Sequence, residues 1–540
     1  MLACSWSVTS LAPYLSNKRY GTGFSCKAID LQSHANGDQD NEIKKKKKKK
    51  KKVVIVGSGW AGLGAAHHLC NQGFDVTVLE GSPEDVGIRG YWYPHRNIFN
   101  LVDELGIKPF TNWIKSAQYS GEGLEVEFPI FQDLPQLPTP LGTLYHSQFA
   151  RLPLFDRLTS LPLLAAVVDF DNTDTAWRKY DSITARELFK QFGFSERLYR
   201  DVFGPLLQVG LFAPAEQCSA AATLGVLVYV LSHQKDFDMV YCRGTVKEKI
   251  FEPWIDFMRT KESCIMLMQL YWQLESPGSR NLSRIVLRTK EEFLKVLNLA
   301  SIDVVTVKLH LDRKVKIPNA SNVCSGFDDS FGWTLFDLNV IHDEHKDDPV
   351  TVIQADFYHS NEFLPLKDED IVAKVMSYLS KCIKDFESAS VVDKEIGRFP
   401  QSLTHFFPGS YKYMMRGATS FSNVFMAGDW IINRHGSWSQ EKSYVTGLET
   451  ANRVVDYLEE GSFAKIIPVE EDEPHIEALR NLNRRFNEFK DQVPLSQFSF
   501  FSVFANPSLS LSLSSSSLRF VSDRKLKLYN GCAAKESRCG

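Results

Sequence analysis

The feature that most constrains the fold is a glycine-rich turn between an apolar run and a helical pattern. Residues 53–56 (VVIV) are apolar and short enough for a buried parallel strand. The next six residues read GSGWAG, and residues 61–72 are typical of a helix that stops at Gly73. A second apolar run ends on Glu80, at the usual spacing of about 20 residues from the first glycine. This order predicts a strand–turn–helix–strand unit that holds a dinucleotide.

Each position of the turn has a physical role in such a unit. Gly57 makes the tight turn, Gly59 lets the backbone approach a pyrophosphate, and Gly62 allows close packing of the helix. Trp60 and Ala61 lie where the turn meets the helix, whose N-terminus attracts the negatively charged pyrophosphate.

The acid that ends the second strand narrows the choice of ligand. Glu80 can accept a hydrogen bond from a ribose hydroxyl, which disfavours NADP and leaves NAD and FAD open. A purely structural turn is the alternative interpretation, because glycine-rich turns are common.

A second motif lies near the other end of the chain. Residues 424–427 are apolar, Gly428 and Asp429 follow directly, and a helical pattern begins at Gln440. An NAD domain is complete within one stretch of chain, whereas a site assembled from both ends suits a longer ligand. We therefore expect FAD.

The two motifs together resemble the flavin amine oxidase and carotenoid desaturase superfamily, and within it the plastid phytoene and zeta-carotene desaturases. The resemblance runs from about residue 53 to residue 460. The segments that carry it are residues 87–107, 192–227, 242–254, 423–430 and 439–447.

The resemblance implies further cofactor contacts. Gly428 and Asp429 would approach the flavin diphosphate and ribityl chain, and Gln440 and Glu441 the pyrimidine end. A helix N-terminus there would stabilise negative charge on the reduced flavin. Arg89 would lie at the ring face, together with three aromatic residues for which a role in the core is an equal alternative: Tyr91, Trp92 and Tyr93.

The expected fold class is α/β: a split FAD-binding Rossmann-like domain of the glutathione-reductase type, with an inserted α+β substrate domain. The expected parts are a transit peptide and lysine-rich linker, the first FAD-binding part, the substrate domain with strands that return to the FAD sheet, the closing FAD-binding part, and a C-terminal helix with a serine-rich tail. Their bounds are 1–52, 53–106, 107–390, 391–460 and 461–540.

The expected activity is that of an FAD-dependent oxidoreductase that removes hydride from an apolar polyene, with quinone or oxygen as electron acceptor. We assign no catalytic base, because placing the C–H bond against the flavin can supply most of the rate. An amine oxidase and a catalytically weak plastid flavoprotein remain alternatives, and an NAD dehydrogenase is a more remote one.

Composition bears on localisation and partners. Residues 1–29 hold five serines, three basic residues and no acid, which favours a plastid over a mitochondrial transit peptide. Outside the nine lysines of Lys44–Lys52 the chain is acidic, which argues against nucleic-acid binding. Residues 137–168 are rich in leucine, proline and aromatic residues, which fits either a peripheral membrane contact or core packing.

Two further stretches carry expectations that the structure can test. Residues 260–290 show no clean alternation, so the returning strands are not expected there. Residues 342–348 (HDEHKDD) hold metal-binding residue types, but the charged stretch reads as a solvated turn, and we predict no metal.

Overall fold

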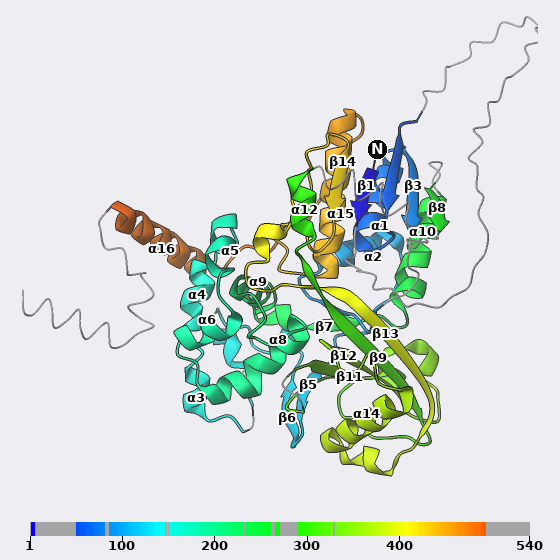
Figure 1. The fold of residues 1–540 in the computed structure, drawn as a ribbon, viewed down its shortest axis with the longest axis vertical. Coiled ribbons are helices and arrows are strands. Elements are labelled where there is room, and N and C mark those ends of the chain that lie inside the picture. The colour runs from blue at the N-terminus through cyan, green and yellow to red at the C-terminus, as the bar shows by residue number, and fades with distance from the viewer. Residues whose placement is uncertain are drawn as a thin grey trace, which may run out of the picture.

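The computed structural model describes ten stretches of the chain, which form three regions (Figure 1). A parallel sheet with α1 and α15 lies at one end, a long twisted sheet with α14 at the other, and a group of helices to one side. The described residues are 2–5, 50–80, 86–139, 141–145, 148–149, 151–231, 233–260, 265–269, 290–327 and 330–492.

The first region is a five-stranded parallel sheet with strand order β14-β1-β2-β3-β8. Its strands are β1 (Leu2–Ser5), β2 (Lys52–Val56), β3 (Asp75–Glu80), β8 (Ile265–Gln269) and β14 (Val424–Ala427). Helix α1 (Trp60–Asn71) follows β2, and α15 (Gln440–Leu458) lies beyond β14 in the chain and packs against α1. The sheet and helices bury one apolar core, as a doubly wound fold requires.

Two strands of this sheet differ from the sequence-based expectation. Strand β8 lies within residues 260–290 and pairs with β3, so the prediction that this stretch supplies no returning strand is wrong. Strand β1 occupies the position between β2 and β14. The five-stranded sheet therefore includes residues 2–5, and the prediction that this domain begins at residue 53 is wrong.

The second region is a seven-stranded sheet with strand order β13-β9-β12-β11-β10-β5-β6. Helix α14 (Asp368–Cys382) covers it through Ile371, Val375 and Leu379. The strands are β5 (Ser116–Ser120), β6 (Gly123–Phe128), β9 (Ala300–Leu311), β10 (Ser321–Cys324), β11 (Gly332–Asp337), β12 (Val352–Tyr358) and β13 (Val391–His405).

The last strand of that sheet corrects a domain boundary. Strand β13 pairs with β9 over most of its length, so residues 391–405 belong to the seven-stranded sheet. The closing part of the nucleotide-binding sheet is β14, and the predicted boundary at residue 391 is too early.

The helical region packs around α9 (Ala220–Leu231), which contributes Ala221, Leu224 and Leu227 to a common core. The C-terminal α16 (Pro474–Gln492) contacts α4, and the Arg480 guanidinium donates hydrogen bonds to three carbonyl oxygens at the end of α4. The other helices of the region are α3 (Leu154–Leu158), α4 (Leu163–Asp169), α5 (Asp174–Tyr180), α6 (Ala185–Gln191), α7 (Glu196–Leu198) and α8 (Gly204–Gly210).

Shorter elements connect the three regions. Strands β4 (Gly90–Trp92) and β7 (Met239–Tyr241) form a two-stranded sheet. The remaining α-helices are α2 (Arg96–Leu105), α10 (Glu252–Arg259), α12 (Glu291–Val296) and α13 (Leu338–Ile341). Single turns of 3₁₀ or π geometry are η1 (Phe131–Asp133), η2 (Leu141–Tyr145), η3 (Tyr199–Phe203), η4 (Gln234–Phe237), η5 (Lys247–Phe251), η6 (Asp343–His345), η7 (Lys384–Ser388) and η8 (Tyr411–Tyr413).

Among the described helices, none is both long and apolar enough to cross a membrane. The predicted serine-rich tail from residue 497 onward lies outside the described residues.

Candidate dinucleotide site

The glycine turn has the geometry that the sequence predicts. Gly57 adopts φ 100°, in the region that favours glycine, and α1 begins directly after Gly59. A Cβ atom built on Gly59 would meet no atom within 4 Å. The space at this helix N-terminus is therefore open, and the residues present fit a bound pyrophosphate.

The predicted ribose-binding acid lies beside this turn. The Ser58 backbone N–H and hydroxyl both donate to Glu80 Oε2, at 2.5 and 2.7 Å. The Gly57 N–H donates to the Leu79 carbonyl oxygen at 2.6 Å. These bonds hold the end of β3 against the turn, which is where an adenosine ribose would lie in this kind of unit.

Small residues bring the second motif close to the first. A Cβ on Gly64 of α1 would lie 2.7 Å from Tyr444 Cδ2, and a Cβ on Gly447 of α15 would collide with the carbonyl oxygen of Ala61. The sequence analysis assigned close packing to Gly62 and did not identify Gly64 or Gly447. The nearby glycines in both helical patterns were the available signal.

The second motif ends at the same edge of the sheet as the first, because β2 and β14 are both parallel to the strand between them. Gly428 adopts φ 131°, and its N–H donates to Thr446 Oγ1 at 2.9 Å. Thr404 Oγ1 donates to the Asp429 carboxylate at 3.3 and 3.4 Å.

A buried lysine lies in the same cluster. Lys442 is 1% exposed, and its Nζ donates to the Ser437 carbonyl oxygen at 2.7 Å. Burial lowers the pKa of Lys442 to about 8, and the charges of Asp429 and Glu449 oppose that shift. Lys442 is not one of the predicted site residues.

The two predicted cofactor residues in the first turn of α15 differ in burial. Gln440 is partly exposed. Glu441 is fully buried and accepts hydrogen bonds from the Asn97 N–H (2.8 Å), Asn97 Nδ2 (2.7 Å) and the Ile98 N–H (2.9 Å). Its carboxylate thus joins α15 to the N-terminus of α2, and its contact with the pyrimidine end of the flavin stays a prediction.

Burial raises the pKa of Glu441 to about 7, and the three N–H donors oppose that rise. The partner residue Asn97 lies 344 positions away in the chain and was not anticipated.

Arg89 belongs to a loop fixed by a buried acid that the sequence analysis also missed. The Ile88 N–H donates to Asp356 Oδ2 at 2.8 Å, and Gln354 Nε2 donates to Asp356 Oδ1 at 2.8 Å. Gly87 adopts φ 68°, and a Cβ there would lie 2.5 Å from Asp356 Oδ2. Burial raises the pKa of Asp356 to about 6, and the charge of Arg89 opposes this.

Of the three aromatic residues after Arg89, Tyr91 is a core residue, whereas Trp92 and Tyr93 are partly buried. Tyr91 is fully buried beside Trp60, whose ring also packs in the core of the parallel sheet. Trp92 packs against Phe237, and Tyr93 against Trp113.

A cavity of about 490 Å³ lies elsewhere and none of the predicted cofactor residues lines it. Its lining comes from α12 and residues 412–420.

The comparisons with known proteins agree with this geometry. Residues 274–455 match the family of flavin containing amine oxidoreductases, and residues 55–108 match the NAD(P)-binding Rossmann-like domain. A probable zeta-carotene desaturase of Synechococcus elongatus is 20% identical over 474 residues, which cover 74% of this chain and 98% of the relative. The 15-cis-phytoene desaturase of Arabidopsis thaliana is 21% identical over 467 residues, which cover 75% of this chain and 80% of the relative. The chain is thus a distant homologue of the carotenoid desaturases within the flavin amine oxidase superfamily.

Solved structures show the fold of this superfamily in the chain. Cyclohexylamine oxidase from Brevibacterium oxydans superposes with a TM-score of 0.55 at 14% identity, covering 76% of this chain and 100% of the oxidase. A putrescine oxidase variant superposes with a TM-score of 0.53 at 15% identity, covering 76% of this chain and 99% of the oxidase. The predicted α/β fold, superfamily and oxidoreductase class are confirmed, whereas the individual cofactor contacts stay predictions.

Proposed function

We propose that the protein is an FAD-dependent oxidoreductase of the carotenoid desaturase type, which acts on an apolar polyene in plastids. The observation that supports this best is the meeting of two glycine motifs, residues 57–62 and residues 428–429, at one edge of a parallel sheet beside an open helix N-terminus. FAD would supply hydride acceptance, with quinone or oxygen as the final acceptor.

The chain's own residues would bind and orient the cofactor. Gly57 and Gly59 leave room for the pyrophosphate, and Glu80 holds the ribose side of the turn. Asp429 and Lys442 place opposite charges at the second motif. No residue is needed as a dedicated base if the substrate C–H bond is placed against the cofactor.

The site can be tested through Gly59→Val, since the branched side chain would fill the pyrophosphate position. The variant should keep its circular dichroism spectrum, because its Cβ meets no atom, and should lose the flavin absorbance at about 450 nm. Gly210→Val is a matched control, since a Cβ there is also uncrowded and the residue ends α8 in the helical region. Full flavin occupancy in Gly59→Val would refute the assignment.

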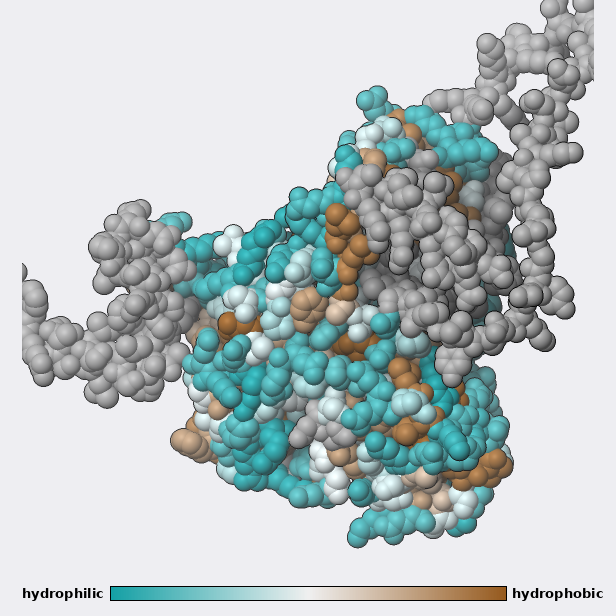
Figure 2. Space-filling model, in the orientation of Figure 1, coloured by the Kyte–Doolittle hydropathy of each residue, from teal (hydrophilic) through white to brown (hydrophobic). Residues whose placement is uncertain are grey.

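An apolar substrate would reach the site from a membrane, and we propose a peripheral membrane contact at Leu141 and residues 154–161. Much of the surface seen in Figure 2 is hydrophilic, with hydrophobic residues in scattered patches. Leu154 and Phe155 of α3 are 69% and 78% exposed, although both are large and apolar. The other exposed apolar residues of this stretch are Leu141, Leu158 and Leu161.

The test of this contact uses Leu154→Ser, Phe155→Ser and Leu161→Ser together, and measures partitioning onto lipid vesicles. We expect partitioning to fall while flavin content is unchanged. Leu163, by contrast, is buried in the helical core, so the core interpretation of residues 137–168 holds for that leucine. Equal partitioning of the triple variant and the parent protein would refute the membrane contact.

An amine oxidase remains the second candidate, because the family match and the fold neighbours include amine oxidases. Steady-state assays with a polyene and with primary amines separate the two. Turnover of amines alone would refute the desaturase proposal and leave the flavin site intact.

A further inference from the structure

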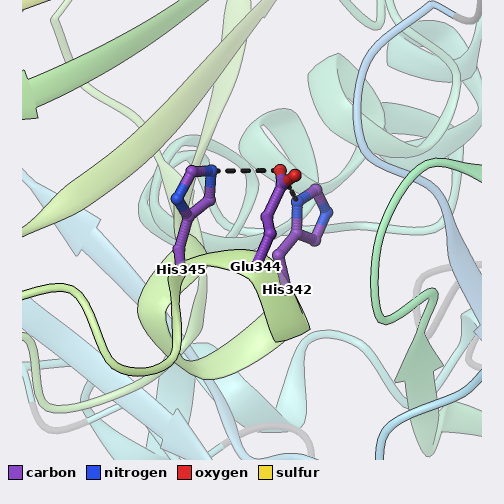
Figure 3. A group of neighbouring side chains, drawn as sticks. All are labelled: His342, Glu344 and His345. Atoms are coloured by element: carbon purple, nitrogen blue, oxygen red, sulfur yellow. Dashed lines mark ion pairs between the residues drawn. The ribbon is translucent and has the colours of Figure 1, made fainter.

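A group of three metal-binding side chains lies at the short connection between β11 and β12. His342 follows α13, and Glu344 and His345 belong to η6. The two histidines are buried, with 6% and 8% of their surface exposed, so the expectation of a solvated turn is wrong for them. Figure 3 shows both imidazole rings beside the Glu344 carboxylate, which lies within 4 Å of a nitrogen of each ring.

The distances between the three groups are close to those of a metal site. Glu344 Oε1 lies 3.1 Å from His345 Nε2 and 3.6 Å from His342 Nδ1. One ligand atom from each residue lies within 4.8 Å of the other two. Tetrahedral zinc with bonds of about 2.0–2.1 Å needs ligand atoms roughly 3.3 Å apart. Small side-chain rotations would therefore complete the geometry.

Three ring nitrogens of this group make no other polar contact. Apart from the contacts with Glu344, neither nitrogen of His342 nor Nε2 of His345 has a hydrogen-bond partner within the described part of the chain. A buried polar nitrogen without a partner is unfavourable, and a metal ion would satisfy two of these three.

The remaining nitrogen of His345 has the partner expected of a metal ligand. His345 Nδ1 lies 2.9 Å from Asp348 Oδ2, which directs Nε2 toward Glu344. Histidines that bind metals commonly place their second nitrogen against a carboxylate in this way.

The neighbouring charges are compatible with a divalent cation. Lys308 Nζ lies 3.9 Å from Glu344 Oε1 and 3.6 Å from Glu395 Oε1, so the lysine can keep Glu395 when a metal takes Glu344. Asp343 is held by Arg243 (2.8 Å) and Lys249 (3.2 Å) and is not needed as a ligand.

We propose that His342, Glu344 and His345 bind one zinc ion, with water in the fourth position. Two imidazoles and one carboxylate are a known zinc ligand set, and Glu344 is 56% exposed, which gives water access to the ion. The ion would fix η6 between β11 and β12.

A second group of similar composition serves as an internal control. His233, Asp236 and Glu470 also lie close together. There, however, Asp236 Oδ2 accepts a hydrogen bond from the His233 N–H at 3.0 Å and lies 3.1 Å from its Nδ1. The Asp236 carboxylate raises the pKa of His233, which favours the protonated form that cannot bind metal.

The experiment is a calorimetric titration of the tag-free, chelator-treated protein with Zn²⁺. We expect one ion per chain, with affinity at least about 100-fold weaker in His345→Ala and in His342→Ala than in the parent and in His233→Ala. Zinc should also raise the melting temperature of the parent and not that of His345→Ala.

Glu344→Gln keeps the test informative if a histidine variant fails to fold, because this side chain is exposed. We expect at least about 10-fold weaker zinc binding in that variant with an unchanged circular dichroism spectrum. Absence of zinc binding by the parent, or equal affinity in the parent and Glu344→Gln, would overturn the proposal.

Discussion

The buried carboxylate of Glu441 offers a test of how the two halves of the nucleotide-binding region are joined. In Glu441→Gln the amide oxygen can accept the two Asn97 donors, but the amide NH₂ then faces the Ile98 N–H, which is itself a donor. A buried donor left without an acceptor costs about 1–3 kcal/mol. We expect the variant to be less stable by that amount at pH 5, where most of the wild-type carboxyl is protonated in the folded state.

The pH dependence follows from the pKa of Glu441, which is raised from 4.5 to about 7. Since the folded state binds this proton more tightly than the unfolded state, the contribution is fully present below the unfolded pKa and is lost as pH rises through the folded pKa. At about 1.4 kcal/mol per pKa unit, the wild type should lose roughly 3 kcal/mol of unfolding free energy between about pH 4.5 and pH 8. The glutamine variant has no such titration, so its disadvantage should shrink as pH rises.

Urea unfolding of the wild type and Glu441→Gln at pH 5 and pH 8, followed by tryptophan fluorescence, measures the gap in unfolding free energy between the two proteins. Other titrating groups are common to both proteins and cancel in the difference. Glu471→Gln, at an exposed position, is the control, and its unfolding free energy should equal that of the wild type at both pH values. A gap that stays constant or widens with pH would refute the reasoning, because it would mean that the three N–H donors and the α2 N-terminus outweigh burial.

Two glycine substitutions test close contacts of the same region. Gly87→Ala places a Cβ 2.5 Å from Asp356 Oδ2 at φ 68°, and urea unfolding should show a loss of about 1–3 kcal/mol; an unchanged midpoint would mean that the loop is free to move. Gly447→Ala directs a Cβ at the Ala61 carbonyl oxygen, so α1 and α15 are overpacked, and we expect a loss of about 1–3 kcal/mol of unfolding free energy and weaker flavin binding. Equal flavin affinity of the variant and the wild type in a titration would contradict this.

The local motifs were predictable because local chemistry determines them. A positive φ at Gly57 and an open helix N-terminus at Gly59 depend on a few neighbouring residues. The predicted start of α1 differed from the observed start by one residue. The second motif was equally readable, since a short buried strand ending in Gly428 leaves few alternatives.

The contacts that join distant segments were not predictable from one sequence. Asn97 bonding to Glu441 and Asp356 bonding to Ile88 each link residues more than 250 positions apart, and neither pair has a local signature. The burial of His342 was also missed, because a charged stretch suggests exposure and only the packed fold shows which side chains turn inward.

Strand β1 depends on the same kind of long-range geometry. Neighbouring strands lie about 4.8 Å apart, so β2 and β14 are roughly 10 Å apart across β1 and cannot pair directly. Helices α1 and α15 are already in close contact at Ala61 and Gly447, so there is little room for them to move closer together. We infer that a strand is needed between β2 and β14, a position that residues 2–5 occupy.

This requirement conflicts with the proposed plastid leader, because a chain cleaved near residue 52 would lose β1. Deleting residues 2–5 should leave about seven backbone pairings of β14 and β2 unmade, as the registers indicate. Each pairing contributes about 0.5–1.5 kcal/mol, and the entropy cost of ordering four residues offsets part of the sum. The net loss of unfolding free energy is therefore about a few kcal/mol. Deleting residues 33–36 is the control of equal length.

Lower flavin occupancy and an earlier urea midpoint in the first deletion alone would show that β1 is required. The intact mass of the mature protein from plastids would then have to include residues 2–5. Equal behaviour of the two deletions would mean that another segment fills the position between β2 and β14, and cleavage of a leader would be compatible with the fold.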